Sequence, residues 1–99
     1  MRKMENQISD AMMLIENLAV NIQIELTNIE FEEMEDGMIE WVGSYELDST
    51  IFRAFKEEAI CDYFDDYLQD EIENIEQEYG VTCKIYIEDD ELVVYFGNE

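Results

Sequence analysis

One long acidic helix is the feature that most constrains how this chain folds. Between Glu57 and Cys83 there are ten carboxylates and no lysine or arginine. Apolar residues recur through this segment and just before it at helical spacing, and the set comprises Phe52, Phe55, Ala59, Tyr63, Leu68, Ile72, Ile75 and Tyr79. Three side chains suited to capping a helix precede it: Asp48, Ser49 and Thr50. The pattern predicts a helix from near Ile51 to Tyr79, ended by Gly80 in a left-handed conformation.

The charges on this helix are arranged in a way that ordinary solvated helices avoid. Carboxylates four residues apart face each other at Glu58 and Asp62, at Asp62 and Asp66, and at Asp66 and Asp70. Each such like-charge pair costs a few tenths of a kcal/mol. The ten charges follow one another about every 3 Å of helix axis, and one strand of B-DNA carries a charge about every 3.4 Å. We interpret the repulsion as a sign that a cationic partner relieves it.

Composition supports a basic partner. The chain has 27 Asp and Glu against 5 Lys and Arg, no histidine, and a formal net charge of -22 on 99 residues. The five cations are Arg2, Lys3, Arg53, Lys56 and Lys84. They are too few for direct binding to nucleic acid or anionic lipid, because each phosphate contact needs a cation. With 47% hydrophobic and 12% aromatic residues, the chain is expected to fold.

The remaining segments predict an α+β fold. Helical spacing covers about residues 5 to 20, and strand alternation follows over residues 22 to 31 with a bulge or break at Asn28. Asp36-Gly37 predicts a tight two-residue turn into a return strand over residues 39 to 47, with a bulge or bend at Gly43. Two further strands, residues 81 to 88 and 92 to 96, flank Asp89-Asp90. The order is αββαββ, which predicts one domain over residues 1–99 with a four-stranded antiparallel sheet and both helices on one face.

Compartment and cysteines have simple interpretations. No apolar run approaches the roughly 20 residues that span a bilayer. Glu5, Asp10 and Glu16 interrupt any signal-peptide core, so we expect a cytoplasmic protein. Cys61 and Cys83 fall in different elements and are expected to be buried small hydrophobes, with a disulfide between them as the alternative.

The chain carries no catalytic signature. Histidine is absent, and so are a nucleophile elbow, a phosphate loop, a dinucleotide fingerprint and a zinc motif. The run Glu88 to Glu91 could attract Ca²⁺, but it lacks EF-hand spacing and is better interpreted as a charged turn. We therefore expect no enzyme activity, no cofactor and no metal site.

Candidate partner-binding residues lie in two acidic segments. The first hairpin gathers six acids around its turn: Glu30, Glu32, Glu33, Glu35, Asp36 and Glu40. Tyr67 and Tyr86 lie outside the apolar phase of their elements, so they either anchor a partner's arginine or edge the core. The partner-binding set that we select is Glu57, Glu58, Asp62, Asp65, Asp66, Asp70, Glu73, Glu76, Glu30, Glu32, Glu35, Asp36 and Tyr67.

In composition and size the chain resembles the small acidic inhibitors that phages and mobile elements use against restriction and CRISPR nucleases. The resemblance implies a DNA or RNA mimic that blocks the cationic groove of a nuclease or another nucleic-acid-binding protein. Two alternatives stay open. One is an immunity protein or antitoxin that caps a basic toxin nuclease. The other is an acidic structural protein that assembles with copies of itself, as a homodimer or through an exposed strand edge.

Overall fold

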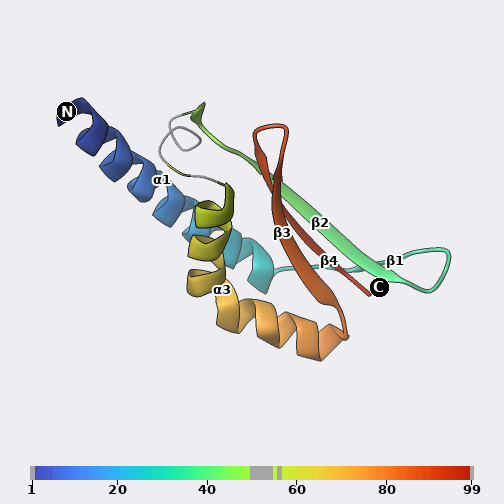
Figure 1. Ribbon diagram of the computed structural model, residues 1–99. Coiled ribbons are helices and arrows are strands. Elements are labelled where there is room, and N and C mark those ends of the chain that lie inside the picture. The colour runs from blue at the N-terminus through green and yellow to red at the C-terminus, as the bar shows by residue number, and fades with distance from the viewer. Residues whose placement is uncertain (1, 50–54, 56, 99) are drawn as a thin grey trace.

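Two long helices cover one face of an antiparallel sheet (Figure 1). The computed structural model describes residues 2–49, 55 and 57–98. The elements are α1 (Arg2–Thr27), β1 (Glu32–Glu33), β2 (Ile39–Glu46), α3 (Glu57–Tyr79), β3 (Thr82–Glu88) and β4 (Glu91–Gly97). The strands lie in the order β1-β2-β4-β3, so β4 is central and β3 forms one edge. The predicted α+β class and the αββαββ order are confirmed.

Helix α1 is longer than predicted, because the expected strand after residue 20 is helical as far as Thr27. Ile22 and Leu26 are four residues apart and continue the buried face of the helix, so they satisfy helical spacing as well as alternation. Ile24, which alternation places with them, points to solvent instead. The helix ends where the Asn28 side chain donates to the carbonyl of Ile24 at 2.8 Å. The predicted bulge at Asn28 is therefore wrong.

The first hairpin is correspondingly short. Strand β1 has two residues, and Glu32 and Glu33 pair with Glu40 and Ile39 of β2. The turn is a three-residue loop and not the predicted two-residue turn, because the Met34 amide donates to the carbonyl of Met38 at 2.7 Å. Only Gly37 in this loop has a positive φ, of 75°. That geometry is typical of a turn closed by one left-handed glycine.

Strands β2, β4 and β3 pair without interruption over their lengths. Gly43 stays in register opposite Val94, so the predicted bulge there is wrong. A glycine fits because the ring of Trp41 lies against it, where an added Cβ would collide. Asp89 and Asp90 turn the chain as predicted, with φ values of 51° and 63° that match a two-residue hairpin turn.

Helix α3 confirms the acidic helix and corrects its apolar face. Its buried residues are Ile60, Phe64, Leu68, Ile72 and Ile75. The predicted face instead held Ala59 and Tyr63, each one position before a residue of the buried row. Ala59 is exposed and Tyr63 is half-buried. Gly80 ends the helix with a φ of 65°, and the Val81 amide donates to the carbonyl of Glu76 at 3.1 Å.

The start of α3 can be compared with the prediction at only a few residues. The helix begins at Glu57, and Phe55 lies in a bend before it. The predicted start near Ile51 and the apolar position Phe52 lie outside the described residues.

Candidate acidic interaction surface

Helix α3 carries all ten of the predicted carboxylates, and they divide by the direction in which they point. Successive residues are rotated by about 100°, so residues opposite the buried face form a single outward row. We call this set the outer acidic row: Glu58, Asp62, Asp66, Asp70 and Glu73, all of them exposed. Residues 57–83 contain no lysine or arginine, so no cation of α3 itself relieves the like-charge repulsion within the row.

Three other acids of α3 bond to neighbouring elements. Glu71 accepts a hydrogen bond from the Gln23 side chain of α1 at 2.8 Å. Glu57 accepts one from the Ile87 amide at 3.4 Å, and Glu76 accepts one from the Cys83 amide at 3.0 Å. Both amides belong to β3 and point away from β4, because the even-numbered residues of β3 make the ladder bonds to β4 and the odd-numbered residues of β3 direct their amides outward. Glu57 and Glu76 therefore cover the open edge of the sheet.

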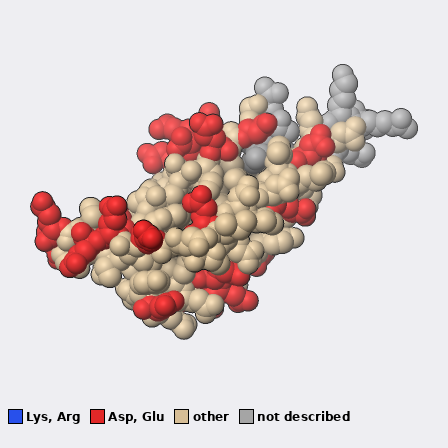
Figure 2. All heavy atoms as spheres, turned by 180° about the vertical axis from the view of Figure 1, so that it is seen from behind, with Lys and Arg blue, Asp and Glu red and all other residues tan. Residues whose placement is uncertain are grey.

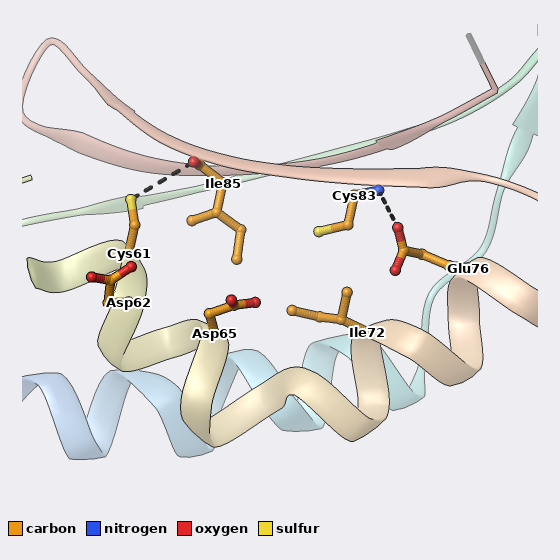
Figure 3. Close-up of a pocket in the computed structure, with 7 residues that line it drawn as sticks. All are labelled: Cys61, Asp62, Asp65, Ile72, Glu76, Cys83 and Ile85. Carbon is orange, nitrogen blue, oxygen red and sulfur yellow. Dashed lines mark hydrogen bonds between the residues drawn. The ribbon is translucent and has the colours of Figure 1, made fainter. Parts of the chain in front are cut away.

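A groove of about 280 Å³ separates α3 from β3 (Figure 3). Its lining residues are Cys61, Asp62, Asp65, Ile72, Glu76, Cys83 and Ile85. The Cys61 thiol donates to the carbonyl of Ile85 at 3.7 Å, a third bond to the β3 edge. Figure 3 shows Asp65 projecting into this groove between the two cysteines. Asp65 is thus placed beside the outer acidic row and not in it.

Both cysteines are free and half-buried in this groove. Burial raises the pKa of Cys83 to about 12, and the charges of Glu76 and Asp65 raise it further. Burial also raises the pKa of Cys61, and Glu57, Asp62 and Asp65 add to the effect. The two thiols are therefore protonated at neutral pH and poor nucleophiles, because the thiolate is the reactive form.

Loss of an edge-covering carboxylate is expected to cost stability. In Glu76→Ala the half-buried Cys83 amide loses its acceptor, and we expect the free energy of unfolding to fall by about 1–3 kcal/mol. Glu73→Ala is the matched control, since Glu73 lies on the same helix in the outer acidic row and should change it by less than about 0.5 kcal/mol. Urea denaturation followed by circular dichroism measures both values. Equal losses in the two variants would contradict the assigned role.

The first hairpin provides the second predicted acidic segment. Glu32 and Glu40 face each other across β1 and β2. They also rim a hollow of about 570 Å³, which is lined by Glu30, Phe31, Glu32, Met34, Glu40, Trp41 and Val42. Glu35 and Asp36 lie in the adjacent turn and are exposed. Aromatic rings beside carboxylates form a setting that suits an arginine or lysine side chain.

The start of the first hairpin contacts the C-terminal end of α3. The ring of Phe31, between Glu30 and Glu32, lies 4.4 Å from the ring of Tyr79 at the end of α3. The ring contact places the start of the hairpin near the C-terminal end of α3, although Phe31 and Tyr79 are 48 positions apart in sequence. Glu32 and Glu40 alternate with the inward-facing Phe31 and Trp41, so they lie on the outer face of the sheet with Val42.

A third acidic group was not selected from the sequence. Glu91 of β4 pairs with Glu88 of β3 on one side and with Glu46 of β2 on the other. Together with the turn residues Asp89 and Asp90 they form what we call the sheet-end acidic group. The run of four acids was visible in the sequence, but its contact with Glu46 depends on the strand register.

Tyr67, the aromatic candidate, is 58% exposed on α3. Its ring stacks on that of Tyr63 with centroids 4.6 Å apart and planes 25° apart. The Tyr63 hydroxyl is shielded from solvent without a hydrogen-bond partner. Its pKa is raised by burial first and then by the neighbouring Tyr67 and Glu16. Tyr67 is therefore an exposed ring that is stacked on its neighbour Tyr63.

The described residues place further limits on the site. They contain no group of three or more metal-ligating side chains that could hold an ion. Among the described side chains Lys84 is the only cation, and its ammonium lies 5.9 Å from the centre of the Tyr95 ring. In the part of the chain that the structure describes, no helix is long and apolar enough to cross a membrane.

Comparisons with known proteins give no relative. No family model, no curated protein and no solved structure matches this chain significantly.

Proposed function

We propose that this chain is an inhibitor that occupies the cationic nucleic-acid groove of a nuclease or another nucleic-acid-binding protein. The observation that carries the proposal is the outer acidic row, five exposed carboxylates on one face of α3 without a described cation among them. The exposed acids of the first hairpin add a second acidic surface. The five carboxylates of the outer acidic row lie along about 22 Å of helix axis, on average one about every 5.6 Å, against about one every 3.4 Å on one strand of B-DNA. Such a surface competes with a phosphate backbone for the same lysines and arginines.

The proposed action is binding without chemistry. Long-range attraction between the acidic surface and a basic groove speeds association, and the bound inhibitor excludes DNA or RNA. The complex is expected to be sensitive to salt, because counterions screen exposed charges beyond about 10 Å at 0.1 M ionic strength. This mode of action fits an inhibitor of the anti-restriction or anti-CRISPR type.

Affinity capture with nucleic-acid competition tests the proposal. The immobilised protein is incubated with a lysate of its native host at low salt, and bound proteins are eluted with duplex DNA or RNA and identified by mass spectrometry. We expect a nuclease or other nucleic-acid-binding protein in the eluate. Its DNA binding, measured by fluorescence anisotropy after purification, should then fall as this protein is added.

The same experiment separates the proposal from a toxin-capping role. An immunity protein or antitoxin binds one cognate toxin and depends on aromatic anchors such as Tyr67. In that case the captured protein would stay bound in the presence of DNA and RNA, and Tyr67→Ala would release it. Capture of a partner that nucleic acid does not displace would therefore refute the mimic.

A further inference from the structure

Helix α1 is apolar on two opposite faces. One face packs in the core and contains Ala11, Ile15, Ala19, Ile22 and Leu26. On the other side of the helix, Met13, Val20 and Ile24 are 59%, 56% and 57% exposed. Such a helix is unusual at the surface of a protein this acidic, because the outward face of an amphipathic helix is normally polar or charged.

The exposed face has the spacing of a coiled-coil seam. Met13, Asn17, Val20 and Ile24 follow one another at intervals of four, three and four residues, which are the d and a positions of successive heptads. We call these four residues the α1 outer seam. Asn17 occupies an a position, where asparagine in a parallel two-stranded coiled coil pairs with its own copy and sets the register.

The α1 outer seam is also poor in charge. Residues 6 to 27 of α1 contain three acids, Asp10, Glu16 and Glu25, whereas α3 contains ten. In Figure 1 α3 crosses in front of α1, so α1 lies on the side turned toward the viewer in Figure 2. Figure 2 shows the acids on this side in separate groups, with areas of other residues between them. Two copies with a net charge of -22 each can approach most closely where such an area faces another.

The β3 edge of the sheet is a poorer place for two copies to meet. The outward amides of Cys83 and Ile87 already donate to Glu76 and Glu57, and the carbonyl of Ile85 accepts from Cys61. A second β3 would have to displace these bonds and would bring further carboxylates close to those of α3. Strand pairing through β3 is therefore disfavoured.

We propose that a second copy of this chain packs against the α1 outer seam as a parallel helix pair, with Asn17 facing Asn17. In this arrangement the flanking positions place Glu16 opposite the partner's Asn21 and Gln23 opposite the partner's Asn28, so like charges do not meet at these positions. Asp10, at the a position one heptad before Asn17, faces its own copy in this register, and this like-charge pair limits the contact to residues 13 to 24. The seam shares no residue with the outer acidic row, so the proposal is independent of the proposed function.

Two matched valine substitutions test the contact. Val20 and Val42 are 56% and 54% exposed, and Val42 lies on the outer face of the sheet in β2. We expect the wild-type protein to dimerise reversibly in sedimentation equilibrium. Val20→Gln should weaken the dimer at least ~10-fold, which corresponds to about 1.4 kcal/mol. Val42→Gln should leave it unchanged, and circular dichroism should show that both variants are folded.

Three outcomes of that experiment would overturn the proposal. The wild-type protein could sediment as a monomer at every concentration. Val20→Gln could dimerise as well as the wild type. Val42→Gln could weaken the dimer as much as Val20→Gln, which would move the contact to the sheet.

A cysteine substitution tests the parallel register. Asn17→Cys places two thiols face to face only if the helices are parallel and in register, so oxidation with copper-phenanthroline should give a disulfide-linked dimer on a non-reducing gel. The wild type and Thr82→Cys, with an exposed thiol on β3, are the controls and should remain uncrosslinked. If Asn17→Cys crosslinks no better than these controls, the parallel pair is refuted.

Discussion

Replacement of Asp62, Asp66 and Asp70 with lysine is expected to abolish binding to the captured nucleic-acid-binding protein. The three residues are exposed in the middle of the outer acidic row, so the change reverses the potential where a basic groove would dock. We expect affinity to fall at least ~100-fold, which is about 2.7 kcal/mol, and the inhibition of DNA binding to disappear. Isothermal titration calorimetry against the purified partner measures the loss.

The matched control reverses the same number of charges elsewhere. Glu46, Glu88 and Glu91 of the sheet-end acidic group are changed to lysine, which alters the net charge by the same amount. This control should retain most of the affinity, because its three residues lie beside the start of α3, where Glu57 bonds to Ile87, and outside the outer acidic row. Circular dichroism and thermal melting show whether each variant is folded. A folded Asp62, Asp66 and Asp70 variant that still inhibits would refute the nucleic-acid mimic.

Phe96→Ala is expected to cause the largest loss of stability. Phe96 has no exposed surface, lies in the central strand β4, and its ring is 6.3 Å from Phe31 and 5.8 Å from Trp41. Truncation of a buried phenylalanine to alanine costs about 3–5 kcal/mol, a large part of the roughly 5–15 kcal/mol that holds a small domain folded. Urea denaturation monitored by the fluorescence of Trp41 gives the free energy of unfolding.

A substitution on the opposite face of the sheet provides the comparison. Tyr86 is 37% exposed on β3, and Tyr86→Ala should cost about 1 kcal/mol, since its ring is not part of the core. If Phe96→Ala were no more damaging than Tyr86→Ala, the core would not be centred on β4.

The sequence predicted those elements whose signals are local. Gly80 ends α3 and Asp89-Asp90 turns the second hairpin, because both depend on the backbone conformation of one or two residues. The order of helices and strands follows from these turn and helix-end positions, together with the helical spacing and the strand alternation of apolar residues. The density of carboxylates on α3 was likewise visible, since one helix carries them all.

The errors arose where two patterns overlap. Ile22 and Leu26 fit both alternation and helical spacing, and only their burial against the core shows that the helix continues. On α3, Ile60 and Phe64 directly follow Ala59 and Tyr63 in sequence. Successive residues are rotated by about 100° around the helix axis, so a shift of one position decides which pair is buried.

Site features that depend on tertiary structure could not be predicted. The contact of Glu91 with Glu46 requires the register of three strands, and the bond from Cys83 to Glu76 requires that α3 lie beside β3. The exposure of Val20 and Ile24 became visible only once residues 22 to 27 were known to be helical.

The bonds between α3 and β3 also bear on the cost of forming a complex. Glu57 and Glu76 fasten α3 to the edge strand near both of the helix's ends, and Cys61 adds a bond between them. The backbone that carries the outward-pointing acids is therefore preorganised, and the spacing of these acids is already fixed in the free protein. A partner that docks there would order side chains only, and the association would lose little backbone entropy.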